Sequence, residues 1–135
     1  MLNKKKIKDL IIPKSKIPIL FQNNVLIDAL DKMNKFKFGI CFCVDKKGKL
    51  IGVMTDGDIR RKILDVQKPF SALLNDDFDL HINKKPKKIL NSSSLVSGLR
   101  LMKKNLIWDL PVVDKKNKLL GMLHLHPVVK YLLKK

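Results

Sequence analysis

The chain has 135 residues, 45% of them apolar, a length that suits one compact domain or two small ones that share a core. No apolar stretch approaches the roughly 20 residues of a membrane span, and no apolar run of signal-peptide length follows the first lysines, so we expect a cytoplasmic protein without a membrane partner. The net charge of +17 comes from 26 lysines and only three arginines, and the lysines are spread along the whole chain. Since base readout and bidentate phosphate recognition favour arginine, we do not expect a nucleic-acid partner.

The first patterned segment combines an extended piece with a helix. Residues 17–21, "IPILF", form a short apolar run that predicts a strand. Leu26, Leu30 and Met33 follow at the spacing i, i+4, i+7, which places them on one face of a helix. Asn24 stands at the position of the N-cap of this helix.

The next segment predicts a hairpin and a second helix. The runs 38–45, "FGICFCVD", and 50–55, "LIGVMT", are apolar and rich in β-branched residues, and Gly48 between them tolerates the positive φ of a turn. A helix is then expected from "DGDIRRKILD" (56–65), and Pro69 ends it.

The chain contains an internal duplication. A shift of 69 residues aligns "VDKKGKLIGVM" (44–54) with "VDKKNKLLGML" (113–123), with seven identities in eleven positions. The same shift pairs the three apolar helix positions of the first half with Leu95, Leu99 and Met102. One offset therefore matches two separate segments.

The second half repeats the elements of the first. Ser93 stands at the N-cap position, "WDLPVVD" (108–114) and "LLGMLH" (119–124) predict hairpin strands, and Asn117 lies in their turn. A last helix is expected within "HPVVKYLLKK" (126–135). With the extended piece "PKKIL" (86–90) before the helix of Leu95, Leu99 and Met102, the order β, α, β, β, α thus occurs twice.

The duplication predicts an α/β (α+β) fold built from two similar repeats. We place the first repeat, with an N-terminal lead-in, at residues 1–68 and the second at 69–135. Neither repeat alone can cover both faces of a three-stranded sheet. We therefore expect the two sheets to pack face to face with the helices outside.

A tandem β-α-β-β-α repeat with a Thr-x-x-Asp step before its last helix resembles the CBS-domain pair, or Bateman module. "IGVMTDGDIRR", followed one repeat later by "LPVVDKKNKLLGMLHLHPVV", looks most like the C-terminal regulatory half of arabinose-5-phosphate isomerases of the sugar-isomerase type, which act in the Kdo pathway. CBS pairs that precede sugar nucleotidyltransferase domains carry a similar "TDGDIRR" string. Both resemblances imply a non-catalytic module whose catalytic domain lies outside these residues.

The resemblance also implies a nucleotide site, commonly for an adenosine-bearing ligand, in the cleft between the two copies. It assigns the ribose to Asp58, and a carboxylate accepts well from two adjacent hydroxyls. The hydroxyl of Thr55 would serve ribose or phosphate, Gly57 would admit a close backbone approach, and the helix N-terminus with Arg60 and Arg61 would favour an anion. The base would lie near the first strand and the start of the next one. The complete implied set is Pro18, Ile19, Phe38, Gly39, Ile40, Thr55, Asp56, Gly57, Asp58 and Arg60.

A purely structural reading of Thr55 and Asp58 is open as well. A Thr three residues before an acidic residue is the pattern of a capping box, which needs no ligand. At the offset of 69, Thr55 maps to His124 and Asp58 to Pro127, so the second repeat lacks the carboxylate. If a nucleotide binds, we expect one site rather than two.

No metal site or required cofactor is expected. His124 and His126 stand two residues apart without a third ligand in sequence. Cys41 and Cys43 share one face of a predicted strand and are interpreted as buried, reduced thiols.

From the sequence we infer a regulatory module that binds a small ligand. The candidate ligands are an adenine nucleotide, a CMP-sugar and a sugar phosphate. A homodimer formed through the helices is expected, with a sugar isomerase or nucleotidyltransferase catalytic domain as the candidate partner. An alternative is a degenerate isomerase remnant with a structural or assembly role, because no residue here is suited to move a sugar proton by itself.

Overall fold

The computed structural model describes residues 4–134, which form two compact units. The first unit comprises residues 17–86, and the second unit comprises the N-terminal segment up to Lys16 together with the chain from Lys87 onward. None of the helices in the described part of the chain is both long and apolar enough to cross a membrane. The repeat boundaries at 1–68 and 69–135 concern the sequence duplication and stay a prediction.

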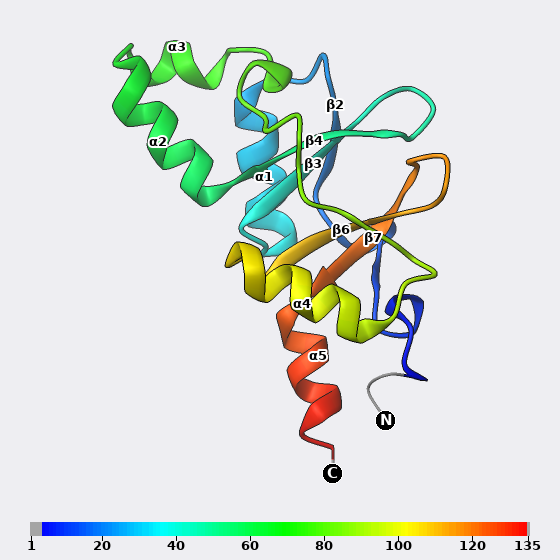
Figure 1. Ribbon diagram of the computed structural model, residues 1–135. Coiled ribbons are helices and arrows are strands. Elements are labelled where there is room, and N and C mark those ends of the chain that lie inside the picture. The colour runs from blue at the N-terminus through cyan, green and yellow to red at the C-terminus, as the bar shows by residue number, and fades with distance from the viewer. Residues whose placement is uncertain (1–3, 135) are drawn as a thin grey trace. The chain divides into compact units, whose positions relative to one another are not determined.

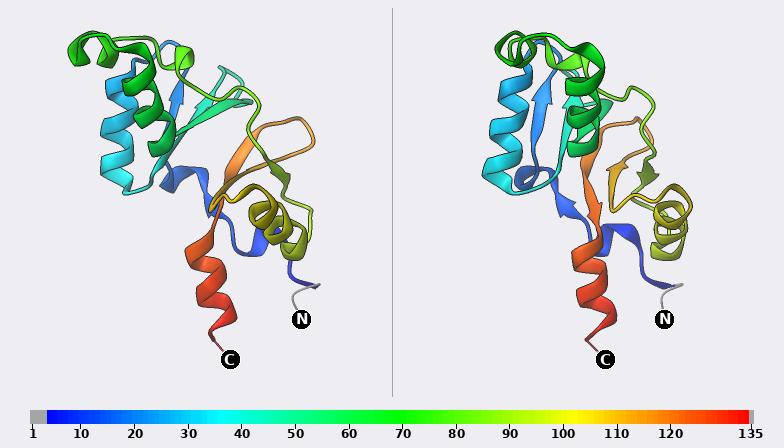
Figure 2. Two further views of the ribbon diagram at one scale, coloured as in Figure 1. Left: turned by 60° about the vertical axis from the view of Figure 1, so that its left-hand side comes forward. Right: turned by 90° about the vertical axis from the view of Figure 1, so that its left-hand side faces the viewer.

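The first unit is a three-stranded sheet with helices (Figure 1). Its elements are β2 (Ile19–Phe21), α1 (Leu26–Phe36), β3 (Ile40–Val44), β4 (Leu50–Thr55), α2 (Asp56–Val66), α3 (Phe70–Leu74) and the 3-10 turn η4 (Phe78–Leu80). The strand order is β2-β3-β4, with β2 parallel and β4 antiparallel to β3. Helix α1 packs on β2 and β3, and α2 adjoins β4 (Figure 2).

The second unit repeats this plan around a four-stranded sheet. Its elements are η2 (Ile7–Asp9), β1 (Ile12–Pro13), η3 (Lys14–Lys16), β5 (Ile89–Leu90), α4 (Leu95–Asn105), β6 (Asp109–Val113), β7 (Leu119–His124) and α5 (Leu125–Leu132). The strand order is β1-β7-β6-β5, with β5 parallel to β6. The N-terminal segment thus supplies an edge strand to the sheet of the second unit.

The structure confirms the α/β class and the β-α-β-β-α order in each repeat. Gly48 and Asn117 occupy the two hairpin turns with φ values of 82° and 65°, as predicted. Both cysteines lie fully buried on β3 as free thiols, and burial raises the pKa of each to about 12. The predicted face-to-face packing of the sheets stays a prediction.

Two predicted N-caps are wrong by one residue. Helix α1 begins after Val25, and the side-chain oxygen of Asn24 instead accepts a hydrogen bond from the backbone N–H three residues earlier, at 2.8 Å. Helix α4 is capped by Ser94 rather than Ser93, and its Oγ accepts from the N–H of Ser97 at 3.1 Å. Asn24 closes the turn that follows β2, a role for which asparagine side chains are equally suited.

A glycine in the third strand of each repeat allows another segment to cross it closely. Asn83 exchanges two backbone hydrogen bonds with Val53, next to Gly52, at 2.7 and 3.1 Å. β1 pairs in the same way with β7, where Pro13 lies opposite Gly121. A Cβ at either glycine would overlap a carbonyl oxygen of the crossing segment. Because the two glycines are 69 residues apart, this close crossing belongs to the duplicated plan.

Replacing either of these glycines by alanine should destabilise the chain. For Gly121→Ala and Gly52→Ala we expect a loss of about 1–3 kcal/mol in the free energy of unfolding, because the clashing atom belongs to the backbone. Gly48→Asn is the control, since Asn117 already adopts positive φ at the equivalent turn. Urea unfolding measures all three variants. Wild-type midpoints for both alanine variants would contradict this interpretation.

Candidate functional site

Three strand ends meet at one edge of the first-unit sheet. β2 is parallel to β3, so both strands begin there, and β4 ends there at Thr55. Ile40 lies opposite Thr55 in the β3–β4 register, and the carbonyl of Pro18 accepts a hydrogen bond from the N–H of Phe42 at 2.9 Å. Helix α2 starts at Asp56, directly after Thr55. This first-unit edge therefore combines strand ends with a helix N-terminus, where backbone N–H groups favour an anion.

Thr55 and Asp58 form the capping box of α2. The Thr55 Oγ1 accepts a hydrogen bond from the N–H of Asp58 at 3.2 Å, and Asp58 Oδ2 accepts from the N–H of Thr55 at 2.9 Å. The capping box that the sequence pattern predicts is thus formed. The two bonds also fix the carboxylate of Asp58 in one orientation at the first-unit edge.

The second oxygen of Asp58 is held by Arg61. Their ion pair has an Nη2–Oδ1 distance of 2.8 Å, and the arginine side chain is 59% exposed. Arg61 rather than Arg60 therefore neutralises this carboxylate, which the sequence did not distinguish. An exposed pair of this kind contributes about 0–1 kcal/mol, so a ligand could share or replace the contact at little cost.

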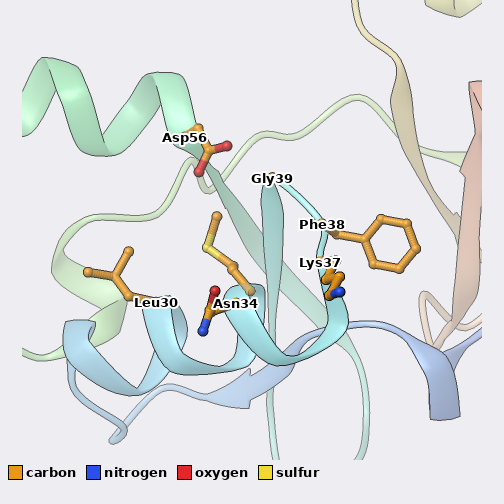
Figure 3. Close-up of a pocket in the computed structure, with 7 residues that line it drawn as sticks. Leu30, Asn34, Lys37, Phe38, Gly39 and Asp56 are labelled. Carbon is orange, nitrogen blue, oxygen red and sulfur yellow. The ribbon is translucent and has the colours of Figure 1, made fainter.

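A hollow of about 550 Å³ adjoins the start of α2 (Figure 3). Its lining includes three residues of the implied set, Phe38, Gly39 and Asp56. The N–H of Asp56 donates to the carbonyl of Gly39 at 3.0 Å, and a Cβ on Gly39 would lie 2.6 Å from Asp56 Oδ2. Glycine is therefore needed for the carboxylate to take this position. Figure 3 shows the Phe38 ring directed away from Asp56.

Helix α1 supplies the wall of this hollow that sequence reasoning missed. The wall consists of Leu30, Met33 and Asn34, with Lys37 just beyond the helix. The apolar spacing places Leu30 and Met33 on one face of a helix, and nothing in that spacing marks Asn34. Lys37 ends α1 in the left-handed backbone region, with φ of 61°. Lysine is uncommon in that region, so the sequence gives no clear signal that the helix ends there.

The remaining residues of the implied set lie in different surroundings. Arg60 lines a second hollow, of about 500 Å³, between α1 and α2, together with Leu30, Asp56, Ile59, Ile63 and Leu64. Gly57 lies beside the guanidinium group of Arg61, from which a Cβ would be 3.2 Å away. Pro18 and Ile40 are buried, and Ile19 is half-buried. The first unit thus gathers Phe38, Gly39, Thr55, Asp56 and Asp58 around the start of α2, with the strand residues beneath.

The second unit has the same backbone but different chemistry at the equivalent place. The N–H of Leu125 donates to the carbonyl of Trp108 at 3.0 Å, as Asp56 does to Gly39. His124 precedes α5 without a capping side-chain bond, and its Nδ1 instead bonds the Asp109 carboxylate on the neighbouring strand. Among residues 4–134, no group of three or more His, Cys, Asp or Glu side chains is placed to hold a metal ion.

Residues 7–65 and 78–134 each match the CBS domain family, and the chain belongs to it. The solved CBS-pair protein CBSX2 of Arabidopsis thaliana, crystallised in complex with AMP, is similar in fold with a TM-score of 0.84. It is 25% identical, and the match covers 96% of this chain and 97% of that one. The predicted recognition of a CBS-domain pair is therefore confirmed.

Curated relatives are longer than this chain. An uncharacterized protein of Helicobacter pylori is 33% identical over 130 residues, which cover 96% of this chain and 38% of the relative. The arabinose 5-phosphate isomerase KdsD of Pseudomonas aeruginosa is 27% identical over 128 residues, which cover 93% and 37%. The chain thus spans about 38% of the length of the first curated relatives that it matches. The link to an isomerase stays a prediction.

Loss of the cap should weaken α2. Thr55→Ala removes the oxygen that accepts from Asp58 N–H, and we expect the free energy of unfolding to fall by about 1 kcal/mol. Thr55→Ser keeps this oxygen and should restore most of the loss. Urea unfolding compares the three proteins, and a Thr55→Ala variant as stable as the wild type would show that the capping bond has no energetic role.

Proposed function

We propose that the chain is a non-catalytic regulatory module that binds an adenine nucleotide at the first-unit edge. The observation that carries the proposal is the capped carboxylate of Asp58, held in a fixed orientation at the N-terminus of an eleven-residue helix. The binding of AMP by the solved relative CBSX2 supports the choice of nucleotide.

The chemistry of the edge suits a ribose phosphate. Asp58 accepts from Thr55 N–H through Oδ2, and a carboxylate has about four lone-pair positions, so it can still accept from ribose hydroxyls. The phosphate would lie near the N-terminal N–H groups of α2, where Arg60 and Arg61 add positive charge. Release of Arg61 from Asp58 would let the guanidinium move to the phosphate while the ribose takes its place.

Only the first repeat offers this arrangement. Pro127 replaces Asp58 in the second repeat, and the carboxylate of Asp109 is already bonded to His124. We therefore expect one nucleotide for each chain. The ligand regulates a partner only if it binds one conformation of the module more tightly than another.

A ligand panel tests the proposal. AMP, other adenine, cytidine and guanine nucleotides, CMP-sugars and sugar phosphates are added to the chain, and the melting temperature is recorded. Binding to the folded state raises stability by about 2.7 kcal/mol at a ligand concentration of 100 times Kd. AMP should raise the melting temperature, and Asp58→Asn should abolish the AMP effect while leaving the ligand-free value nearly unchanged, because an asparagine oxygen can still accept from Thr55 N–H.

Asp65→Asn is the matched control for this experiment. It makes the same change in charge on the same helix at an exposed position, and its response to AMP should equal that of the wild type. A panel in which no nucleotide acts, or an Asp58→Asn variant that responds like the wild type, would contradict the proposal. A silent panel would favour the alternative of a structural remnant.

The regulated partner is proposed from resemblance. The similarity to arabinose 5-phosphate isomerase KdsD supports a sugar-phosphate isomerase catalytic domain, and a sugar nucleotidyltransferase domain is the alternative. The same ligand panel bears on this choice. A response to CMP-sugars would link the module to activated sugars, the products of a nucleotidyltransferase.

We also propose a homodimer formed through the helices. Ile63 and Leu64 of α2 are 43% and 65% exposed, and together with Leu30 and Ile59 they border the apolar hollow between α1 and α2. Sedimentation should give a dimer for the wild type and a monomer for Leu64→Lys, since a charge would be buried in the interface. A wild-type chain that sediments as a monomer would exclude this contact.

A further inference from the structure

Acidic residues are unequally divided between the two units. The first unit has 12 Lys and Arg against nine Asp, whereas the second unit has 17 Lys and Arg against only three Asp. A compositional bias of the whole chain can explain an abundance of lysine but not a shortage of acids in one half. The second unit therefore carries most of the net charge of the protein, and the overall composition does not explain this uneven distribution.

The two repeats differ in their acidic residues at equivalent positions. At the offset of 69, the acids at 31 and 65 become Arg100 and Lys134, and those at 28, 56 and 58 become Ser97, Leu125 and Pro127. The lysines of the first hairpin, in contrast, are all retained, as Lys115, Lys116 and Lys118. The second repeat thus lacks acids at five positions where the first has them, while the hairpin lysines are the same in both.

The three acids that remain in the second unit are used within it. Asp9 accepts from the N–H of Lys6 at 3.1 Å, and Asp109 bonds His124. Asp114 accepts from the N–H groups of Lys116 and Lys118 at 2.8 and 2.9 Å, and these hydrogen bonds lower its pKa. In the described part of the chain, the recorded salt bridges of Lys and Arg all lie in the first unit. With three carboxylates against 17 basic side chains, most of the positive charge of the second unit is not compensated within it, although Asp114 attracts Lys116 and Lys118.

Six exposed lysines gather near the β6–β7 hairpin, a surface that we name the basic edge (Lys14, Lys16, Lys88, Lys115, Lys116 and Lys118). β1 is antiparallel to β7, so η3, which follows β1, runs toward the start of β7 beside the hairpin. The Nζ of Lys88 donates to the side chain of Asn117 in the hairpin turn at 2.6 Å. Figure 1 shows the hairpin projecting beyond the strands β6 and β7.

We propose that the second unit binds the phosphate backbone of a nucleic acid through the basic edge. Lysines act as point charges that bind phosphates and release counterions, which gives affinity without base readout. The total composition argued against a nucleic-acid partner, but it did not reveal that the acids are confined largely to one unit.

The distribution of apolar residues favours nucleic acid over a lipid surface. Apart from Leu90, the exposed large hydrophobic side chains that the structure describes in the second unit belong to α5, to the residue after it or to the connection after α4, at the opposite end of the sheet from the hairpin. They are Leu106, Trp108, Val129, Leu132 and Leu133. Stable attachment to a membrane surface usually combines basic charge with several inserted apolar groups, and beside the basic edge the described residues offer Leu90 alone, which is 38% exposed.

Fluorescence anisotropy of the full chain with a labelled DNA duplex tests this proposal. The duplex has about 20 base pairs, and binding is measured from about 50 to about 200 mM KCl, a range over which phosphate contacts lose affinity steeply. The variant carries Lys115→Gln, Lys116→Gln and Lys118→Gln. We expect at least about a tenfold loss of affinity at the lowest salt and a salt slope that is shallower by about 2 to 3.

The matched control carries Lys46→Gln, Lys47→Gln and Lys49→Gln at the equivalent positions of the first unit, with the same change in net charge. Its affinity should stay within about threefold of the wild type. Absence of duplex binding at the lowest salt would overturn the proposal, as would equal losses in the two variants, which would mean that net charge alone acts. Binding to vesicles of anionic phospholipid without binding to the duplex would overturn it in favour of a membrane surface. Asp58→Asn should leave duplex binding unchanged, so this test is independent of nucleotide binding at the first-unit edge.

Discussion

The proposed nucleotide site depends on the reciprocal hydrogen bonds between Thr55 and Asp58. They join the end of β4 to the start of α2 without an intervening loop, and they fix the carboxylate of Asp58 at the edge where β2 and β3 begin. Because both bonds use backbone N–H groups that a helix start leaves unsatisfied, the cap forms without any ligand. The capping and the binding readings of this pair are therefore compatible, and the cap would orient the group that the ligand meets.

The duplication shows which parts of this plan are structural and which are free to change. Both repeats keep the glycine in the third strand, the hairpin Asp that accepts two backbone N–H groups, and the backbone bond that ties the last helix to the preceding strand start. The second repeat has replaced the capping pair with a His124–Asp109 contact across β6 and β7, and it has lost most of its acids. The same fold thus carries a candidate nucleotide site in one repeat and a strongly basic surface in the other.

Much of the fold could be predicted because its signals are periodic and occur twice. Apolar spacing predicted α1 and α4, the aligned hairpins predicted the central strands, and α2 and α5 were expected in the segments that follow those hairpins. The sequence could not show that residues 12–13 form an edge strand, because two residues are too short for an alternating pattern and the partner strand is more than 100 residues away. It also could not choose between Arg60 and Arg61 as the partner of Asp58, since that depends on the rotation of α2 about its axis. The hollow beside Asp56 was missed because its wall comes from α1, whose residues serve the core equally well.

In our proposal, the first repeat binds one nucleotide and the second repeat binds none. An NMR titration of the uniformly ¹⁵N-labelled chain with AMP tests it most directly, because each backbone amide reports on its own surroundings. We expect saturable shifts for the amides of Gly39, Thr55, Gly57 and Asp58, with little change at His124 and Leu125. Shifts concentrated at His124 and Leu125, or none at saturating AMP, would contradict it.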